Sequence, residues 1–182
     1  MKKTFKKTFI KLAIASLALT GFAAQAVTLA GPAVNYNGHQ YTLLSSTDSW
    51  TDSEAFAITL GGHLVAVNDA AEMAFLNSTF GSNSLWIGLE RTGPSSFAWT
   101  NGDALTYTNW AGGEPNNAGG NENYVHTYAN NGTWNDLSNN SNYAGAKFGV
   151  LETAVSEPSE IALMFAGLGI MGYIARRRKA AK

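Results

Sequence analysis

Carboxylates and side-chain amides are concentrated in the part of the sequence between the motifs EPN and WND. The chain has no cysteine, and no histidine lies in the loop that begins with EPN. A ligand set made only of oxygen atoms suits hard cations, and a flexible set of many ligands suits calcium better than magnesium. Zinc would call for nitrogen or sulfur ligands. The candidate calcium ligands are Glu114, Asn116, Glu122, Asn135 and Asp136.

Pro115 lies between two of these candidates. An X-Pro peptide bond adopts the cis form at modest cost, and a cis bond here would turn Glu114 and Asn116 toward one centre. Carboxylates packed this closely repel one another without a cation, so we expect the loop to be loose without calcium. The alternative interpretation is a solvated polar loop, because Asn, Gly and Glu are common in such loops.

The charge distribution excludes one class of partner. From residue 27 to residue 159 the only basic residues are Arg91 and Lys147, against twelve acidic residues, which gives this body a formal charge of −10. Nucleic-acid binding needs Lys and Arg at the surface, so no nucleic-acid partner is expected. Because the chain has no cysteine, no disulfide framework supports the fold.

The elements that must position the candidate ligands are two helices followed by short strands, which is typical of the α+β class. Helices are predicted over 50–62, with a Thr51–Glu54 capping box, and over 68–81, with Asn68 as N-cap. The segment 101–123 has little periodicity, and a loop of that length in a compact domain is usually functional. Short strands are predicted at 40–46, 63–67, 84–90, 97–100, 123–128, 132–136 and 147–152.

The two ends of the chain have the composition of targeting segments. Residues 1–26 combine a basic start, an apolar stretch and Ala24-Gln25-Ala26, which predicts a secretory signal peptide, with a membrane anchor as the alternative. At the other end, SEPSE leads into fifteen uncharged residues and then RRRKAAK. The uncharged run is short against the roughly 20 residues that span a bilayer, and a basic cluster holds a segment's end on the cytoplasmic side.

Residues 37–152 resemble a C-type lectin-like domain over nearly its full length. The matching motifs are GGHL, WIGL, YTNWAGGEPN and WND, with a final LE, and their order and separations are more specific than any one of them. The resemblance implies an α+β C-type lectin-like fold with two helices, short antiparallel sheets and a long ligand-binding loop. The implied domain covers 37–153, after the signal peptide and a lead-in at 27–36.

The resemblance also implies a function residue by residue. One calcium ion is held by the five candidates named above, and two vicinal sugar hydroxyls join its coordination shell. Glu114, Asn116, Glu122 and Asn135 also hydrogen-bond those hydroxyls, with glutamates accepting and asparagines donating. The form EPN is associated with mannose-, glucose- or fucose-type sugars. The disulfides usual in the family are replaced here, by Ala57 with Leu151 and by Tyr124 with Tyr143. No second ion is expected, although Glu90, Asn117 and Asn123 match auxiliary positions.

The C-terminal tail, residues 154–182, is similar to the PEP-CTERM sorting tail of Gram-negative bacteria, with Ser156 in place of the first proline. That similarity implies export across the inner membrane and transient association with it. Processing by an exosortase would then leave the protein at the cell surface or in the extracellular matrix, bound to a mannose-type glycan or an exopolysaccharide. An ordinary C-terminal anchor is the alternative.

Two other functions remain to be weighed against a lectin. The first is a calcium-stabilised matrix or protein-interaction module on the same fold, without sugar binding. The second is a glycosidase, which would need two carboxylates across a cleft. Glu114 and Asp136 would have to fill that role, and the sequence marks no acid of raised pKa beside them, so no enzyme is expected.

Overall fold

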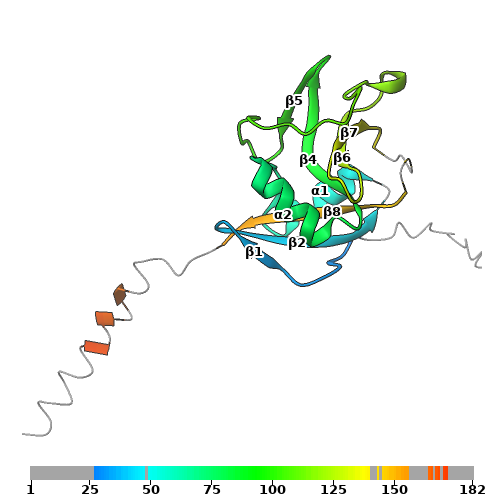
Figure 1. Ribbon diagram of the computed structural model, residues 1–182. Coiled ribbons are helices and arrows are strands. Elements are labelled where there is room, and N and C mark those ends of the chain that lie inside the picture. Colours follow the sequence, from blue (N-terminus) through cyan, green and yellow to red (C-terminus); the bar gives the residue numbers. More distant parts are fainter. Residues whose placement is uncertain are drawn as a thin grey trace, which may run out of the picture.

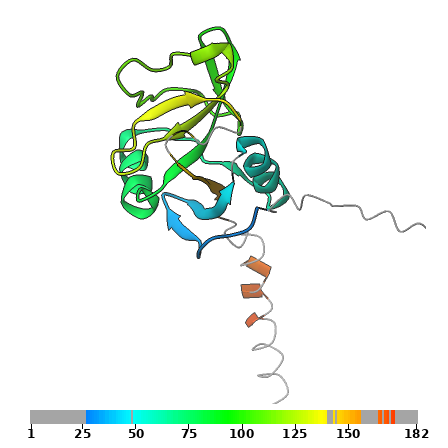
Figure 2. The same cartoon turned by 90° about the vertical axis from the view of Figure 1, so that its right-hand side faces the viewer.

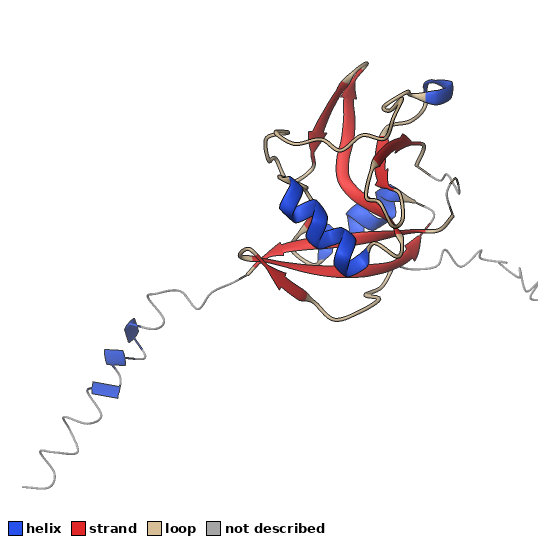
Figure 3. Cartoon of the chain, viewed as in Figure 1, coloured by secondary structure: helices blue, strands red, loops and turns tan. Residues whose placement is uncertain are grey.

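The computed structural model describes residues 27–155, except 48, 140–142 and 144, together with 164–165, 167–168 and 170–171. It contains two helices and an eight-stranded sheet, which confirms the predicted α+β class (Figure 3). The elements in chain order are β1 Val34–Tyr36, β2 His39–Thr47, α1 Trp50–Thr59, β3 His63–Leu64, α2 Ala70–Phe80, β4 Ser84–Gly93, β5 Ser96–Trp99, η1 Ala118–Gly120, β6 Tyr124–Thr127, β7 Trp134–Leu137 and β8 Lys147–Ala154.

The sheet has the strand order β1-β2-β8-β4-β6-β7, with β3 added on β8 and β5 added on β4. Every pair is antiparallel except β4 with β8. The tip of the β4–β5 hairpin and the turn η1 lie at the same end of the molecule (Figures 1 and 2). This end holds the loop that carries EPN.

The two helices cover opposite faces of the sheet, and the strands divide their side chains between them. On β8, Val150 belongs to a buried cluster with α2 and its neighbour Leu151 to a buried cluster with α1. Trp86 of β4 likewise joins the α1 cluster, whereas the residues on either side of it join the α2 cluster. Side chains of a strand alternate between its two faces. The core therefore has two layers, with the helices on either side of the sheet (Figure 2).

The start of α1 differs from the sequence prediction. Ser49 is the N-cap, and its hydroxyl accepts from the backbone N–H of Asp52. Glu54 is buried and does not form the predicted capping box, because its carboxylate accepts from the backbone N–H of Leu64 and pairs with His63 Nδ1 at 2.6 Å. Glu54 therefore holds the chain that leaves the helix against it.

The second helix is capped one residue later than predicted. The side chain of Asp69 accepts from the backbone N–H of Glu72, while the Glu72 carboxylate accepts from the backbone N–H of Asn68. The arrangement differs from a capping box in one respect, because Glu72 accepts from the residue before the N-cap and not from the N-cap N–H itself. Gly81 ends the helix, as predicted.

Of residues 27–36, predicted as a lead-in, Val34–Tyr36 form strand β1 of the sheet. Val27 is buried, Leu29 bridges Leu44, and β1 pairs with β2. These residues supply apolar contacts and backbone hydrogen bonds to β2, which would otherwise be an edge strand with unpaired backbone groups.

The positions that replace the family's usual disulfides are filled in two ways. Ala57 and Leu151 lie together in one buried apolar cluster. Tyr124 stacks on Trp50 with ring centroids 4.5 Å apart, while Tyr143 lies edge-on to Tyr128 at 6.5 Å. The two tyrosines therefore pack against different aromatic partners.

The predicted signal peptide, residues 1–26, lies outside the described residues, as does most of the predicted sorting tail. Within the tail, Ala154 ends β8, and the described residues at 164–165, 167–168 and 170–171 are helical. The large apolar side chains of these helical residues, such as Phe165 and Ile170, are exposed. Within the described part of the chain, no helix has both the length and the apolar character needed to span a membrane.

Candidate functional site

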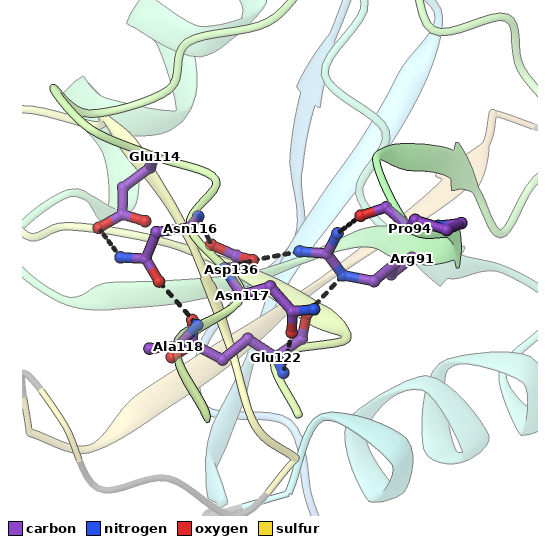
Figure 4. A network of polar contacts seen from close by, with 8 residues as sticks. All are labelled: Arg91, Pro94, Glu114, Asn116, Asn117, Ala118, Glu122 and Asp136. Atoms are coloured by element: carbon purple, nitrogen blue, oxygen red, sulfur yellow. Dashed lines mark hydrogen bonds and ion pairs between the residues drawn. The ribbon is translucent and has the colours of Figure 1, made fainter. Parts of the chain in front are cut away.

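The carboxylate of Asp136 is the anchor for the loop that carries EPN. Asp136 is fully buried on β7, and its Oδ1 accepts from the backbone N–H of Asn116 at 3.0 Å. Its Oδ2 accepts from the backbone N–H of Asn117 at 2.9 Å and from the guanidinium of Arg91 (Figure 4). One carboxylate thus joins three segments that are distant in sequence.

Short-range hydrogen bonds fold the loop around Ala118. Asn116 donates from Nδ2 to Glu114 Oε1 at 3.0 Å and accepts at Oδ1 from the Ala118 N–H at 2.8 Å. The same N–H lies 2.6 Å from Glu122 Oε2. Asn117 adopts the left-handed conformation, with φ of 49°, and its Oδ1 accepts from the Glu122 N–H. The Glu114–Pro115 bond is cis. These contacts bring Glu114, Asn116 and Glu122 into one network with Asp136 (Figure 4).

Arg91 completes this network and was not among the predicted site residues. Its Nε donates to the Glu122 carbonyl and its Nη1 to the Pro94 carbonyl, each at 2.8 Å, while Nη2 pairs with Asp136. The guanidinium also lies 4.5 Å from the centre of the Phe97 ring. The available signal was compositional, because Arg91 is one of only two basic residues in an acidic body.

Asn135 is held from the other side, by the sheet itself. It is 4 % exposed, and its Nδ2 lies 3.3 Å from Nε2 of His126, the residue directly opposite it on β6. Its Oδ1 is buried and has no hydrogen-bond partner among the described residues. The structure therefore places Asn135 next to Asp136 in the chain but ties its side chain to a different neighbour.

Burial, together with neighbouring acids, raises two pKa values in the site. The pKa of Glu114 is raised by burial and by the negative charges of Asp136 and Glu122. Burial also raises the pKa of Glu122, as does the charge of Asp136, although the Ala118 N–H and Arg91 act in the opposite direction. The site therefore has a surplus of negative charge that a cation would relieve.

Ligand oxygens that lack a hydrogen-bond donor indicate where a cation could bind. Glu114 Oε2 and Asn135 Oδ1 are buried acceptors without a partner among the described residues. An unpaired buried acceptor is costly, and it calls for a bound ion or another donor. Asp136 behaves differently, because its oxygens are already occupied by Arg91 and two backbone N–H groups. Within the described residues, no three His, Cys, Asp or Glu side chains form a group that could hold a metal. Of the five predicted ligands, Glu114 and Asn135 therefore each offer a buried oxygen to a cation, one from a carboxylate and one from an amide.

A cavity of about 590 Å³ lies beside the anchor, on the side of Arg91. The tip of the β4–β5 hairpin and the loop 105–117 form its walls, and Pro115 and Asn116 are among its lining residues. Its lining includes Phe97, Leu105 and Trp110, so one wall is apolar.

Comparison with known proteins places residues 46–144 in the family described as the lectin C-type domain. A C-type lectin of Micrurus corallinus is 32 % identical over 147 residues, which cover 75 % of this chain and 93 % of that protein. Lectin BRA-3 of Megabalanus rosa is 32 % identical over 111 residues, or 59 % of this chain and 68 % of that lectin.

Solved structures agree with the sequence comparison. The C-type carbohydrate-recognition domain of cow CD23 superposes with a TM-score of 0.62 at 26 % identity, covering 71 % of this chain and all of that domain. The predicted C-type lectin-like fold is therefore confirmed. The relatives are lectins, which bind carbohydrates and are not enzymes, in agreement with the prediction of a non-enzymatic protein. With the fold, the motifs and the relatives in agreement, the chain belongs to the C-type lectin domain family.

Proposed function

We propose that this chain is an exported, calcium-dependent lectin whose site is formed by Glu114, Asn116, Glu122, Asn135 and Asp136. The observation that carries the proposal is the pair of buried oxygens without a partner, Glu114 Oε2 and Asn135 Oδ1. Both belong to residues that the resemblance assigned to calcium, although nothing in that resemblance required them to be left unpaired.

The chain's own groups support sugar recognition as well as ion binding. Calcium, when bound, would supply a centre to which two vicinal hydroxyls coordinate. Glu114 and Glu122 can accept hydrogen bonds from those hydroxyls. The amides of Asn116 and Asn135 each use one N–H within the protein. Since a primary amide has two N–H donors, each retains one for a sugar.

The EPN motif supports a mannose-, glucose- or fucose-type sugar as the ligand. The cow CD23 domain was crystallised in the presence of a GlcNAc2Man3 oligosaccharide, which agrees with that class. We extend the proposal to mannose-type glycans or exopolysaccharides outside the cell.

The proposed location rests on the two ends of the sequence. A signal peptide over 1–26 and a sorting tail over 154–182 support export across the inner membrane of a Gram-negative bacterium. The tail would associate with that membrane until exosortase-type machinery removes it. The mature protein would then lie at the cell surface or in the extracellular matrix.

Calcium-dependent stability tests the ion site directly. A ligand that binds only the folded state raises the melting temperature, so calcium should stabilise the wild-type domain relative to EDTA. Glu114→Gln should lose most of this gain, because it removes a carboxylate of the site. Asp52→Asn, which removes a carboxylate at the exposed start of α1 and away from the network, should keep it. Equal calcium responses of the two variants would contradict the proposed site.

The alternative function is a calcium-stabilised module that binds matrix or protein partners without sugar. In that case Glu114→Ala lowers the melting temperature in calcium but leaves partner binding intact. For a lectin, the same variant loses carbohydrate binding.

A further inference from the structure

We propose that His126 is a positioning residue that fixes the side-chain amide of Asn135 with its carbonyl oxygen facing the ligand site. The inference rests on the proposed calcium site for its function, but its geometry stands on the sheet alone. It begins from the register of β6 and β7, in which His126 and Asn135 are direct cross-strand partners. Such partners have neighbouring side chains on one face of the sheet.

The tautomer of His126 follows from its contact with the backbone of Thr127. The Nδ1 atom lies 3.0 Å from the backbone carbonyl of Thr127. A carbonyl oxygen can only accept, so Nδ1 must carry the proton. A neutral imidazole has a single N–H, and Nε2 is then left as an acceptor.

The charge state of the ring agrees with this assignment. His126 is fully buried, and no acidic side chain among the described residues forms an ion pair with it. A buried imidazolium without a counter-charge would be costly. The imidazole is therefore neutral near neutral pH, and a doubly protonated ring does not compete.

The orientation of the Asn135 side-chain amide follows from its contact with His126 Nε2. The atom that faces His126 Nε2 must be a donor, so the Nδ2 amide group of Asn135 takes this place at 3.3 Å. The opposite orientation would set the Asn135 carbonyl oxygen against the lone pair of Nε2. Oδ1 is consequently turned away from the histidine, and it is the buried, unpaired oxygen of the site.

Aromatic packing keeps the histidine itself from turning. The ring lies edge-on to Trp86, with centroids 6.0 Å apart, and edge-on to Tyr128, at 5.0 Å. Trp86 is fully buried between the sheet and α1. The orientation of one ligand oxygen is thereby set by the core, independently of the EPN loop.

Two variants separate a positioning role from a merely structural one. His126→Leu keeps an apolar group of similar bulk but removes the acceptor for Asn135, whereas His126→Gln can retain an acceptor near the position of Nε2. Loss of a residue that orients a metal ligand typically weakens metal binding about 10- to 100-fold. We expect calcium affinity, measured by isothermal titration, to fall by about that factor in His126→Leu and to recover in His126→Gln.

Melting temperatures with and without calcium give a second test of the positioning role. In EDTA, His126→Leu should melt somewhat below the wild type, because it leaves a buried amide donor of Asn135 unpaired. The deficit should widen when calcium is added, since the variant gains less from the ion. Thr42→Val, which removes a buried hydroxyl on β2 away from the site, serves as a control and should leave calcium affinity unchanged. Wild-type calcium affinity in His126→Leu would overturn the positioning role, as would a loss in His126→Gln as large as that in His126→Leu.

A measurement without calcium keeps the inference separate from the proposed function. Nitrogen-15 NMR of the wild-type protein in EDTA reports the imidazole tautomer and the coupling across a hydrogen bond from Asn135 Nδ2 to His126 Nε2. A neutral ring protonated at Nδ1, coupled to Asn135, supports the inference even if the wild type binds no calcium, which would overturn only the proposed function. A ring protonated at Nε2 overturns the inference whatever calcium does.

Discussion

Arg91 and Asp136 form an ion pair whose carboxylate side chain is fully buried and whose guanidinium side chain is 8 % exposed. The same guanidinium reaches the carbonyls of Pro94 and Glu122, so one side chain connects the β4–β5 hairpin, the EPN loop and β7. Asp136 is also one of the five proposed ligands. The pair therefore links the stability of the loop to the charge of the site.

Arg91→Gln should destabilise the domain by about 3–5 kcal/mol, the usual cost of breaking a buried ion pair on one side. Urea unfolding in EDTA measures this loss. In the double variant Arg91→Gln/Asp136→Asn, no charge is left uncompensated, so its loss should be smaller than the sum of the two single losses. A cost below about 1 kcal/mol for Arg91→Gln would place the pair among ordinary surface ion pairs.

Calcium should stabilise Arg91→Gln more than it stabilises the wild type. Without the guanidinium, the Asp136 carboxylate has no counter-charge, and a cation in the site would supply one. The measurement is the rise in melting temperature between EDTA and saturating calcium for both proteins. An equal or smaller rise in the variant would show that Arg91 and calcium do not compensate the same charge.

The raised pKa values of Glu114 and Glu122 predict how the stability of the metal-free domain changes with pH. A carboxyl whose pKa is higher in the folded state binds its proton more tightly there. The contribution of this proton to the stability of the folded state is therefore complete at pH values below the unfolded-state pKa. It is lost as pH rises through the folded-state pKa. In EDTA, the wild type should therefore lose stability relative to Glu114→Gln/Glu122→Gln as pH rises above about 4, near the ordinary pKa of a glutamate.

Melting temperatures across this pH range test the prediction, with Glu90→Gln as the control for removing one carboxylate elsewhere. In calcium the trend should reverse, because protons compete with the metal for carboxylate ligands. Parallel curves for the wild type and the double variant in EDTA would show that the two glutamates carry no excess repulsion.

The glycine in the WIGL motif is required by a close approach of two strands. A Cβ atom added to Gly88 would lie 2.3 Å from the carbonyl oxygen of Leu64, whereas one added to Gly112 meets no atom within 4 Å. Gly88→Ala should cost about 3 kcal/mol through overpacking, and Gly112→Ala should stay within about 0.5 kcal/mol. Chemical unfolding of both variants measures the difference, and similar losses would contradict the packing shown here.

The sequence predicts the elements whose signals are local. The helix that ends at Gly81 and the buried strand around Trp86 have their caps, stops and apolar spacing within a few neighbouring residues. The cap of α1 was predicted wrongly because Glu54, three residues after Thr51, is used by His63 and Leu64 instead. Such a partner is selected by tertiary packing, which a local pattern does not contain.

The candidate site also has some features that the sequence predicts locally and others that depend on tertiary packing. The EPN and WND motifs predict the ligand types, and the structure brings the Asn116 N–H to Asp136 across twenty positions. The contributions of Arg91 and His126 could not be predicted, because each depends on strand register and on partners from other elements. A single arginine or histidine in a strand pattern has no periodic signal that distinguishes it from an ordinary strand residue.

The central claim is that this domain binds sugar through calcium held by the EPN and WND segments. The most direct test is isothermal titration of the purified domain with mannose in calcium and again in EDTA, together with Glu114→Gln and Asp52→Asn. We predict binding heat in calcium for the wild type and Asp52→Asn, and none in EDTA or for Glu114→Gln. Heat that is unchanged by EDTA would contradict the claim, as would the absence of heat with every mannose-, glucose- and fucose-type sugar tried.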